Sequence, residues 1–447
     1  MAITKGRKSA RHWAYLAISR IEADQAYSDL ILSHVFEQQF FSDKDRGFIN
    51  ELVRGTVRWK KKLQWILSQL LKDPAKVPEQ IKWILWLGLY QIIYMSRTPD
   101  FAAVNESVKL TKKLNYMKWV RLVNGVLRTF LRNPQEIKYP NPKQEPVKYL
   151  AVVHSQPEWL VERWIDQFGY EQTEQLCMAF NKPPVVTVRP NTLKISLKEF
   201  EKMLRENQFV YELSKVKDYY RLIKINSEKY RQLLQDGLMT VQDESAGLVA
   251  LLAAPEHEQI VCDLCSAPGG KSMHLAELTE DKLSIISGDI NFSRSKLVKN
   301  AKERLQLSAV NVVVADANNF PVNKADLVIL DAPCSGLGVL AKKPDLRWQR
   351  KPTSMRLLVK LQNELLQNAA RLVKNKGFLV YSTCTIDKEE NENVILNFVK
   401  HHPEFSVCNP DTTLISKDFI TGDSMVRTWP HQHQMDGSFA VKLQKDE

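Results

Sequence analysis

Four short apolar runs, each carrying or ending near an aspartate, constrain the fold of this chain more than any other feature. They lie within residues 260–331, and their carboxylates belong to Asp263, Asp289, Asp316 and Asp331. Apolar runs of this length between turn residues are typical of buried strands. The carboxyl ends of parallel strands share one rim, where ligands bind. A single aspartate often only forms a turn, but four in register predict a rim lined by carboxylates.

The first run passes directly into a glycine-rich turn. Residues 260–271 read Ile-Val-Cys-Asp-Leu-Cys-Ser-Ala-Pro-Gly-Gly-Lys, and residues 271–278 can start a helix whose N-terminal N–H groups face the space over the turn. Asp289 follows Gly269 by 20 residues, the separation at which an acid binds a ribose hydroxyl in dinucleotide-type units. Neither common phosphate-binding glycine motif is present. This favours a nucleoside with a non-phosphate tail as ligand.

The remaining patterns predict a multidomain protein. Strand and helix alternate over residues 258–400, which predicts a doubly wound α/β sheet with right-handed crossovers. Residues 10–133 show helical spacing throughout, and prolines mark a linker after them. We therefore expect a helical domain at 1–135, a linker at 136–150, a small α+β module at 151–240 and an α/β domain at 241–447.

Positive charge is concentrated in the first third of the chain. Residues 1–150 hold 26 Lys and Arg against 13 Asp and Glu, and the remainder is close to neutral. This favours a polyanionic partner, and nucleic acid rather than membrane because no apolar stretch is long enough to span a bilayer. A solvated helical surface is the alternative. The basic cluster predicted to contact phosphates, with Trp59 and Trp65 nearby, is Arg54, Arg58, Lys60, Lys61 and Lys62.

The sequence also predicts the cellular setting. Residues 1–8 lack the apolar core of a signal peptide, so we expect a cytosolic protein with reduced cysteines. Cys262 and Cys265 are spaced like half a zinc site, but no second pair accompanies them, and Cys262 should be a buried strand residue. We expect no metal, no membrane contact and a monomer.

Two other cysteines point to covalent chemistry. Cys334 and Cys384 each come just after a predicted parallel strand, so both should reach the ligand-binding rim. A thiolate that attacks C6 of a pyrimidine makes C5 nucleophilic enough to accept a methyl group. The base must leave its stack for this attack, and the Asp331 carboxylate near N3 would stabilise the intermediate. The residues alone leave open which cysteine is the nucleophile.

Three motifs resemble those of the RNA cytosine-5 methyltransferases of the Sun/Fmu/nucleolar-protein-two family, which use S-adenosylmethionine. They are Cys-Ser-Ala-Pro-Gly-Gly-Lys at 265–271, Asp-Ala-Pro-Cys-Ser-Gly at 331–336 and Ser-Thr-Cys-Thr at 382–385. The resemblance implies a Rossmann-like class I methyltransferase domain. It also implies that Cys384 attacks C6, that Cys334 assists product release, and that Asp331 lies near the methyl donor. DNA cytosine methyltransferases look similar but place the nucleophile in the Pro-Cys position.

The same resemblance implies the cofactor-binding residues, with Asp289 at the ribose and Asp316 on the adenine side. The full set is Cys265, Ser266, Ala267, Pro268, Gly269, Gly270, Lys271, Asp289, Asp316 and Asp331. Ser266 stands where the family commonly has Ala.

Residues 102–108 and 123–128 resemble the helical domain of the antitermination factor NusB. A NusB-like domain fused to this catalytic module is similar to bacterial 16S ribosomal RNA cytosine-5 methyltransferases, which implies 16S rRNA as partner and RNA binding by the basic helical domain. Methylation of tRNA cytosine is the alternative within enzymes. A non-catalytic RNA-binding or antitermination factor is the alternative of another class.

Overall fold

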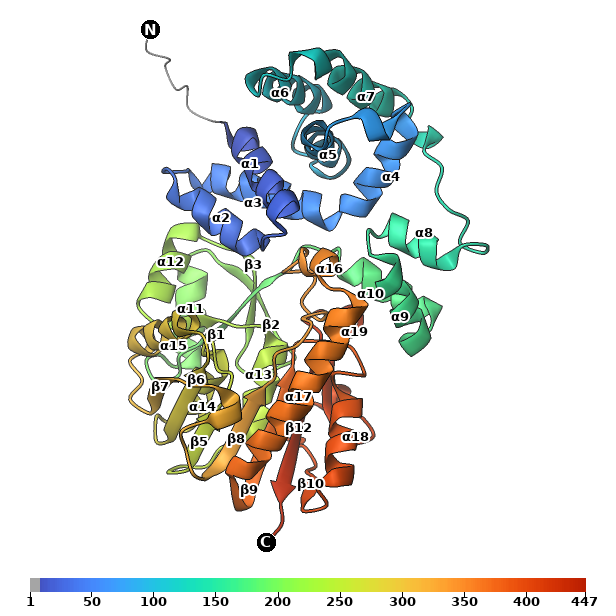
Figure 1. The fold of residues 1–447 in the computed structure, drawn as a ribbon. Coiled ribbons are helices and arrows are strands. Elements are labelled where there is room, and N and C mark those ends of the chain that lie inside the picture. The colour runs from blue at the N-terminus through green and yellow to red at the C-terminus, as the bar shows by residue number, and fades with distance from the viewer. Residues whose placement is uncertain (1–8) are drawn as a thin grey trace. The chain divides into compact units, whose positions relative to one another are not determined.

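The computed structural model describes residues 9–447 and divides into two compact units (Figure 1). The first comprises Met1–Lys182 with Leu340–Gln349, and the second comprises Pro183–Val339 with Arg350–Glu447. Residues 1–8, on which the expectation about a signal peptide rests, lie outside the described part. Among the described residues no helix is long and apolar enough to cross a membrane.

The first unit begins with seven helices, as the apolar spacing over residues 10–133 predicts. They are α1 Ala10–Asp24, α2 Ser28–Glu37, α3 Asp43–Arg58, α4 Lys60–Leu70, α5 Glu79–Tyr94, α6 Asp100–Lys113 and α7 Val120–Arg132. Two glycines inside these helices allow close packing. A Cβ at Gly55 would lie 2.0 Å from the ring of Tyr90, and one at Gly88 would lie 2.8 Å from the Leu127 side chain. Glycine therefore permits α5 to approach α3 and α7.

Three further helices belong to the first unit: α8 Pro146–Val153, α9 Glu158–Phe168 and α10 Tyr170–Ala179. Helix α8 packs on α4 and α9, and α9 packs on α10. The first unit thus extends to Lys182, whereas the sequence pattern places the start of the α+β module at residue 151. The apolar faces of these helices are covered by other helices of the same unit, which a local pattern does not reveal.

The second unit opens with a small antiparallel sheet in the order β2-β3-β1-β4. Its strands are β1 Val186–Pro190, β2 Val210–Leu213, β3 Tyr220–Lys224 and β4 Met239–Val241. Helices α11 (Leu197–Glu206) and α12 (Ser227–Gln235) share its core through Phe200, Leu204 and Leu233. This is the expected α+β arrangement.

The large sheet of the second unit has eight strands. They are β5 Ile260–Asp263, β6 Ser284–Asp289, β7 Val310–Val314, β8 Ala325–Asp331, β9 Val373–Thr383, β10 Phe405–Val407, β11 Val426–Thr428 and β12 Ser438–Lys445. The order is β10-β12-β9-β8-β5-β6-β7, and β11 also pairs with β12. Strands β5 to β9 are mutually parallel, whereas β12 runs antiparallel to β9. The predicted doubly wound core is confirmed, and antiparallel strands extend one edge.

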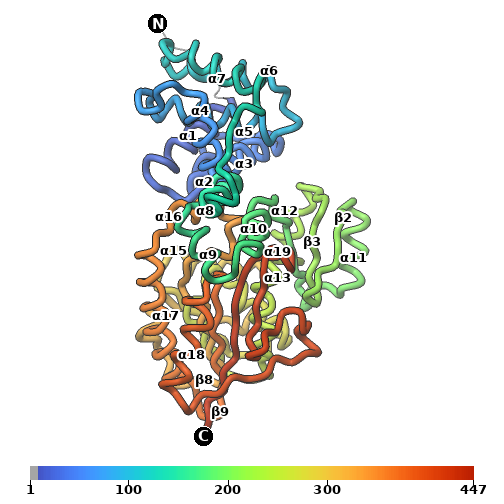
Figure 2. Tube along the Cα trace, turned by 90° about the vertical axis from the view of Figure 1, so that its right-hand side faces the viewer, coloured from blue at the N-terminus to red at the C-terminus, as the bar shows by residue number. Residues whose placement is uncertain are grey.

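Helices cover both faces of this sheet (Figures 1 and 2). On one face lie α13 Glu244–Ala253, α14 Gly270–Leu278 and α15 Phe292–Leu305, and on the other lie α17 Pro352–Leu372 and α18 Glu392–His401. Separate apolar cores fill the two faces. The remaining short helices are α16 Leu346–Gln349, α19 Pro430–His433, η1 Pro74–Lys76, η2 Met117–Trp119, η3 Pro134–Glu136, η4 Ala317–Asn319 and η5 Lys417–Phe419.

Candidate active site

The carboxyl ends of the parallel strands bring the three sequence motifs together. Strand β5 lies between β6 and β8, and β8 lies between β5 and β9, so the chain reverses its direction of sheet growth beside β5. Open α/β sheets bind ligands at such a switch point. The turn after β5 carries residues 265–271, and the loops after β8 and β9 carry Cys334 and Cys384.

The turn between β5 and α14 is held to the neighbouring strand. The backbone N–H of Ser266 donates to the Gly288 carbonyl at 2.8 Å, and the N–H of Gly269 donates to the Ser266 carbonyl at 2.7 Å. Gly269 has φ +102, a left-handed conformation that side chains rarely adopt. Helix α14 begins at Gly270, so its first N–H groups have no partner within the helix. Such a start suits a polar or anionic ligand end.

An ion pair joins the first two motifs. The Nζ of Lys271 lies 2.6 Å from a carboxylate oxygen of Asp331, and the hydroxyl of Ser382 donates to the other oxygen at 2.8 Å. Burial alone would lower the pKa of Lys271, but the nearby Asp331 carboxylate outweighs it and the pKa is raised. Lys271 therefore stays charged, and the two oxygens of Asp331 are oriented by donors from α14 and from β9.

Two further aspartates follow the neighbouring strands. Asp289 ends β6, is almost fully buried, and accepts the Asn291 N–H at 2.9 Å, with Arg294 at 3.3 Å from its second oxygen. Asp316 lies two residues beyond β7, is exposed, and accepts the Asn318 N–H at 2.9 Å. Both carboxylates are thus oriented by the chain that leaves their own strand.

Cys334 and Cys384 lie side by side. Their sulfur atoms are 3.3 Å apart, with Cys384 exposed and Cys334 partly buried. The hydrogen bond with Cys384, together with burial, raises the pKa of Cys334 well above its usual value. Cys334 is therefore a protonated thiol at neutral pH that can donate its hydrogen to the other sulfur. The expectation that both cysteines reach one rim is confirmed.

One of the four aspartates does not line the rim as expected. Asp263 is fully buried, because its side chain points between the sheet and α14, where the Ser272 hydroxyl donates to it at 2.6 Å. Burial raises the pKa of Asp263 to about 7. Successive side chains of a strand point to opposite faces of the sheet, and both faces of this sheet are covered by helices, so a position at the strand end does not by itself guarantee exposure.

The sequence pattern missed two buried polar residues behind the cysteines. Glu390 and Asn391 are both fully buried, and α18, the helix that the alternation of strand and helix predicts after β9, begins only at Glu392. Residues 388–391, just before the helix, form a turn. The side chains of Glu390 and Asn391 in this turn bond to the two cysteine loops. A run of polar residues directly after a rim motif was the available signal.

The four other cysteines are buried or partly buried. Cys177 and Cys262 are fully buried, as expected for Cys262, and Cys265 and Cys408 are partly buried. Burial raises the pKa of Cys262 and of Cys265 to about 12. Within residues 9–447 no group of three or more His, Cys, Asp or Glu side chains is arranged to hold a metal ion.

The basic cluster after residue 53 has partners within the first unit, and its expected phosphate contacts stay a prediction. Lys60 pairs with Glu22 at 2.6 Å, and Lys61 pairs with Glu158 at 2.7 Å. Arg58 is nearly buried and donates to the Ala341 carbonyl at 2.8 Å, and Arg54 donates to the Lys342 carbonyl and pairs with Asp29. Burial lowers the pKa of Lys62. Most of these partners are distant in sequence, so composition alone does not reveal them.

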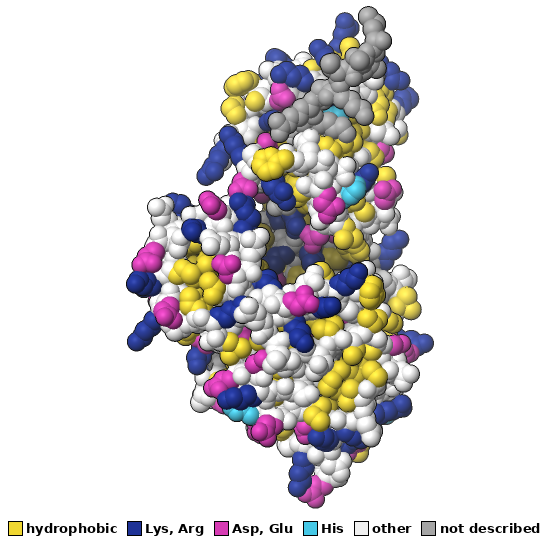
Figure 3. Space-filling view, turned by 90° about the vertical axis from the view of Figure 1, so that its left-hand side faces the viewer, with side chains coloured by type: hydrophobic (Ala, Val, Ile, Leu, Met, Phe, Trp, Pro, Cys, Tyr) yellow, Lys and Arg dark blue, Asp and Glu magenta, His cyan; other side chains and the backbone are white. Residues whose placement is uncertain are grey.

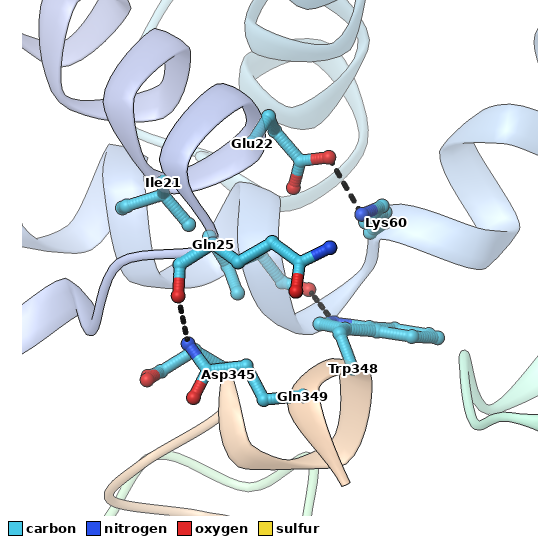
Figure 4. A pocket seen from close by; sticks show the side chains of 8 residues that line it. Ile21, Glu22, Gln25, Lys60, Asp345, Trp348 and Gln349 are labelled. Carbon is cyan, nitrogen blue, oxygen red and sulfur yellow. Dashed lines mark hydrogen bonds and ion pairs between the residues drawn. The ribbon is translucent and has the colours of Figure 1, made fainter. Parts of the chain in front are cut away.

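Segment Leu340–Gln349 provides several of those partners and closes a small cavity in the first unit (Figure 4). The indole of Trp348 donates to the Val57 carbonyl at 2.7 Å, and the Gln349 amide donates to the Gln25 carbonyl at 3.1 Å. The cavity measures about 90 Å³, and the Glu22–Lys60 ion pair forms part of its wall. Its polar groups bond mainly to each other.

Relatives identify the family. The chain is 36% identical to a probable ribosomal RNA small subunit methyltransferase B from Bacillus subtilis, over 98% of this chain and 99% of that protein. It is 34% identical to ribosomal RNA small subunit methyltransferase B from Yersinia pseudotuberculosis, over 99% and 100% of the two chains. The chain belongs to the 16S rRNA methyltransferase RsmB/F family.

Family models divide the chain in the same order as the structure. The 16S rRNA methyltransferase RsmB/F model matches residues 249–444, the NusB family model matches 8–132, and the ferredoxin-like domain of RsmF/B-like methyltransferases matches 156–220. The NusB-like domain, the small middle module and the methyltransferase fold expected from the sequence are therefore confirmed. All three cysteine-bearing and glycine-bearing motifs fall within the RsmB/F match.

Solved structures agree with this fold. The crystal structure of PH0851 is 26% identical and aligns with a TM-score of 0.80 over 98% of this chain and 99% of that one. A methyltransferase homologue from Pyrococcus horikoshii is 25% identical, with a TM-score of 0.58 over 67% and 99% of the chains. NSun6 from the same organism, solved with SFG, is 21% identical, with a TM-score of 0.57 over 65% and 98%, and supports the fold alone.

Proposed function

We propose that this chain transfers a methyl group from S-adenosylmethionine to C5 of a cytosine in 16S rRNA, with Cys384 as nucleophile. The observation that carries the proposal is the pair of thiols, 3.3 Å apart, in loops that follow two adjacent parallel strands. Beside them, Asp331 is held by Lys271 from the glycine-rich turn. A binding factor without chemistry has no need for two thiols at this distance.

The residues present fit a nucleoside cofactor with a charged amino-acid end. The start of α14 offers unpaired backbone N–H groups, and Asp289 and Asp316 offer carboxylates at the ends of the next two strands. The first group suits a carboxylate, and an aspartate at a strand end suits ribose hydroxyls or the adenine side. We assign cofactor binding to residues 265–271 with Asp289, Asp316 and Asp331. S-adenosylmethionine would supply an electrophilic methyl group there and leave as S-adenosylhomocysteine.

The two sulfurs divide the covalent work. In its thiolate form Cys384 accepts the thiol hydrogen bond of Cys334, which lowers the cost of the charge. Its sulfur attacks C6, so that a C6–S bond forms and the C5=C6 electrons become available at C5. N3 takes a proton from water as negative charge develops there, and the Asp331 carboxylate stabilises the resulting N3–H by accepting its hydrogen bond.

Release follows once C5 carries the methyl group. Once Cys384 is bonded to C6, Cys334 gives its thiol proton to water. Its thiolate then takes the C5 proton, the C5–H electrons restore the C5=C6 bond, and N3 returns its proton to water. The C6–S bond breaks and its electron pair returns to Cys384. The hydrogen bond with Cys384 no longer contributes once that sulfur is bonded to carbon, but burial still raises the pKa of Cys334, which makes its thiolate the stronger base.

We assign RNA binding in the first unit to the exposed basic residues of α6, α7 and the turn between them. This basic hairpin surface consists of Lys109, Lys112, Lys113, Lys118, Arg121, Arg128 and Arg132. On the face drawn in Figure 3, Lys and Arg side chains lie among acidic and apolar ones, so charge sign alone does not mark a binding surface there. Within residues 9–447, Lys109 pairs with Glu106 and the other six residues have no ion pair, so this surface suits phosphates.

The deciding experiment measures labelled methyl transfer from S-adenosylmethionine to unmodified 16S rRNA, with unmodified tRNA in parallel. Wild type, Cys384→Ala and Cys334→Ala are compared, and protein–RNA adducts are sought on a denaturing gel. We expect transfer to 16S rRNA, loss of transfer and adduct in Cys384→Ala, and adduct accumulation in Cys334→Ala. The opposite behaviour of the two variants would make Cys334 the nucleophile. Transfer only to tRNA would favour the alternative substrate, and no transfer by wild type would favour a binding factor.

A further inference from the structure

Two consecutive buried side chains, Glu390 and Asn391, hold the backbone on both sides of the two cysteines. Both residues are fully buried in the turn between β9 and α18. Each bonds to a different cysteine loop. Because they are neighbours in the chain, a displacement of one loop against the other must deform this turn.

The Glu390 side chain bonds to the Cys334 loop. One carboxylate oxygen accepts the Ser335 N–H at 2.8 Å and the Gln362 amide at 2.9 Å, and the other accepts the Ser335 hydroxyl. The same Gln362 amide donates to the Pro333 carbonyl at 2.9 Å. The residues before and after Cys334 are thus both tied to one carboxyl group, directly or through Gln362.

The Asn391 side chain bonds to the chain on both sides of Cys384. Its side-chain oxygen accepts the Thr383 hydroxyl at 2.6 Å, and its amide donates to the Thr385 carbonyl at 3.0 Å. The residues before and after Cys384 are therefore tied to one amide group. The two loops also bond to each other directly, because the hydroxyls of Ser335 and Thr385 lie 2.9 Å apart and the Gly338 N–H donates to the Cys384 carbonyl at 3.0 Å.

We propose that Glu390 and Asn391 are positioning residues that together set the separation of the two reactive thiols, with Glu390 orienting Cys334 and Asn391 orienting Cys384. The division of labour between the two thiols rests on the proposed function, whereas the geometry does not. A displacement of about 1 Å at a reacting group can lower a rate about a hundredfold. Loss of Glu390 should therefore impair release, and loss of Asn391 should impair attack.

A buried carboxyl group needs a reason to be retained, because it costs free energy unless it is fully bonded. Burial raises the pKa of Glu390, and the donors Ser335 and Gln362 counteract part of that rise. The two carboxylate oxygens of Glu390 accept hydrogen bonds from Ser335 and Gln362. The Cys334 loop therefore requires a side chain with two acceptor oxygens at this position. Glutamine keeps one acceptor oxygen and should rescue part of the function, whereas alanine keeps none.

The first test measures geometry alone, without RNA. The full-length protein is treated with the thiol oxidant diamide, and the Cys334–Cys384 disulfide is quantified by mass spectrometry of unreduced peptides. We expect rapid formation in wild type and at least about tenfold slower formation in Glu390→Ala and Asn391→Ala. The matched control is Glu364→Gln, an exposed α17 carboxylate 3.8 Å from Lys360, which should behave like wild type. Equal rates in all four proteins would overturn the proposal.

The second test separates the two residues by their opposite effects on 16S rRNA. Glu390→Ala should accumulate the covalent adduct, as Cys334→Ala does, with Glu390→Gln intermediate. Asn391→Ala should form adduct about tenfold or more slowly. If the two alanine variants lost adduct formation equally while S-adenosylhomocysteine binding and melting temperature were kept, the proposed division would be wrong. If wild type formed no adduct, the proposed function would fail, and the disulfide result would still decide the geometry.

Should an alanine variant fail to fold, milder substitutions keep the proposal testable. Ser335→Ala removes one hydroxyl from the Glu390 side, and Thr383→Val removes one from the Asn391 side. Both are close to the original side chains in shape. Their expected effects are smaller, about three- to fivefold in disulfide rate, and unchanged rates in both would contradict the proposal.

Discussion

The rim of the large sheet and the basic cluster of the first unit are both prominent in the sequence, yet the structure gathers the predicted residues only at the rim and engages those of the cluster with partners inside the protein. At the rim, Asp331, Cys334 and Cys384 come together because they lie at or just beyond the carboxyl ends of the adjacent parallel strands β8 and β9. In the cluster, Lys60 and Lys61 are engaged by acidic partners and Arg58 by a backbone carbonyl. Topology places strand ends, whereas the fate of a charged surface residue depends on its tertiary partners.

The first prediction concerns Arg347, a fully buried basic residue whose hydrogen bonds are all made within the first unit. Its guanidinium is fully buried and donates to Ser155, Phe180 and Asn181, and burial lowers its pKa to about 9. Arg347→Met leaves buried acceptors unpaired and should destabilise the first unit by about 3 kcal/mol. Urea unfolding of the full chain, followed by tryptophan fluorescence, measures this.

A matched surface change sharpens that result. Lys109→Met removes an exposed pair with Glu106 and should cost at most about 0.5 kcal/mol. Equal midpoints for Arg347→Met and Lys109→Met would mean that the Leu340–Gln349 segment contributes nothing to the stability of the first unit.

The second prediction compares two lysine–aspartate pairs at opposite ends of the same strands. Lys271→Met removes the partner of Asp331 at the carboxyl end, and Lys374→Met removes the partner of Asp326 near the start of β8, at 2.8 Å. We expect about a hundredfold lower methyl transfer for Lys271→Met, because Asp331 loses a charged, largely buried partner. Lys374→Met should change the rate less than twofold. Similar losses in both variants would show a general effect on the sheet.

These contrasts explain what the sequence could predict. The parallel strands, the glycine turn and the two cysteine loops were predictable because apolar runs, Gly269 and the following polar residues lie within a few positions of each other. The helices between these strands were predictable from their helical spacing. Which cysteine is the nucleophile came only from the family resemblance, because the residues alone leave that choice open.

The misses share a physical cause, which is separation along the chain. Arg58 finds its acceptor 283 residues away, and Glu390 holds a residue 55 positions earlier. The full burial of Asp263 depends on a hydroxyl supplied by α14. Partners so distant have no local signature, so neither the structural use of the basic cluster nor the support behind the cysteines could be derived from periodicity.

The third prediction asks which basic residues contact RNA. Replacement of Lys112, Lys113 and Arg128 by glutamine should reduce the slope of log affinity against log salt by about 2 and weaken 16S rRNA binding about tenfold, because each phosphate contact releases counterions. The control replaces Lys60 and Lys61 by glutamine, whose charges are paired within the protein. Fluorescence anisotropy at several salt concentrations measures both. A larger slope change in the control would restore the original assignment of the cluster.

The smallest expected effect concerns the thiol pair itself. The hydrogen bond with Cys384 is the largest cause of the raised pKa of Cys334, so Cys384→Ala should lower that pKa toward its usual value. The thiolate is the form that reacts with iodoacetamide, and a lower pKa populates it more at pH 8.5. Alkylation of Cys334, followed by mass spectrometry, should therefore be a few times faster in Cys384→Ala than in wild type and should rise less steeply from pH 8.5 to 10. Cys408, which is partly buried elsewhere in the same unit, serves as internal reference. An unchanged Cys334 rate would mean that burial, and not the neighbouring sulfur, keeps this thiol protonated, and the donation to Cys384 that favours its role as nucleophile would lose its support.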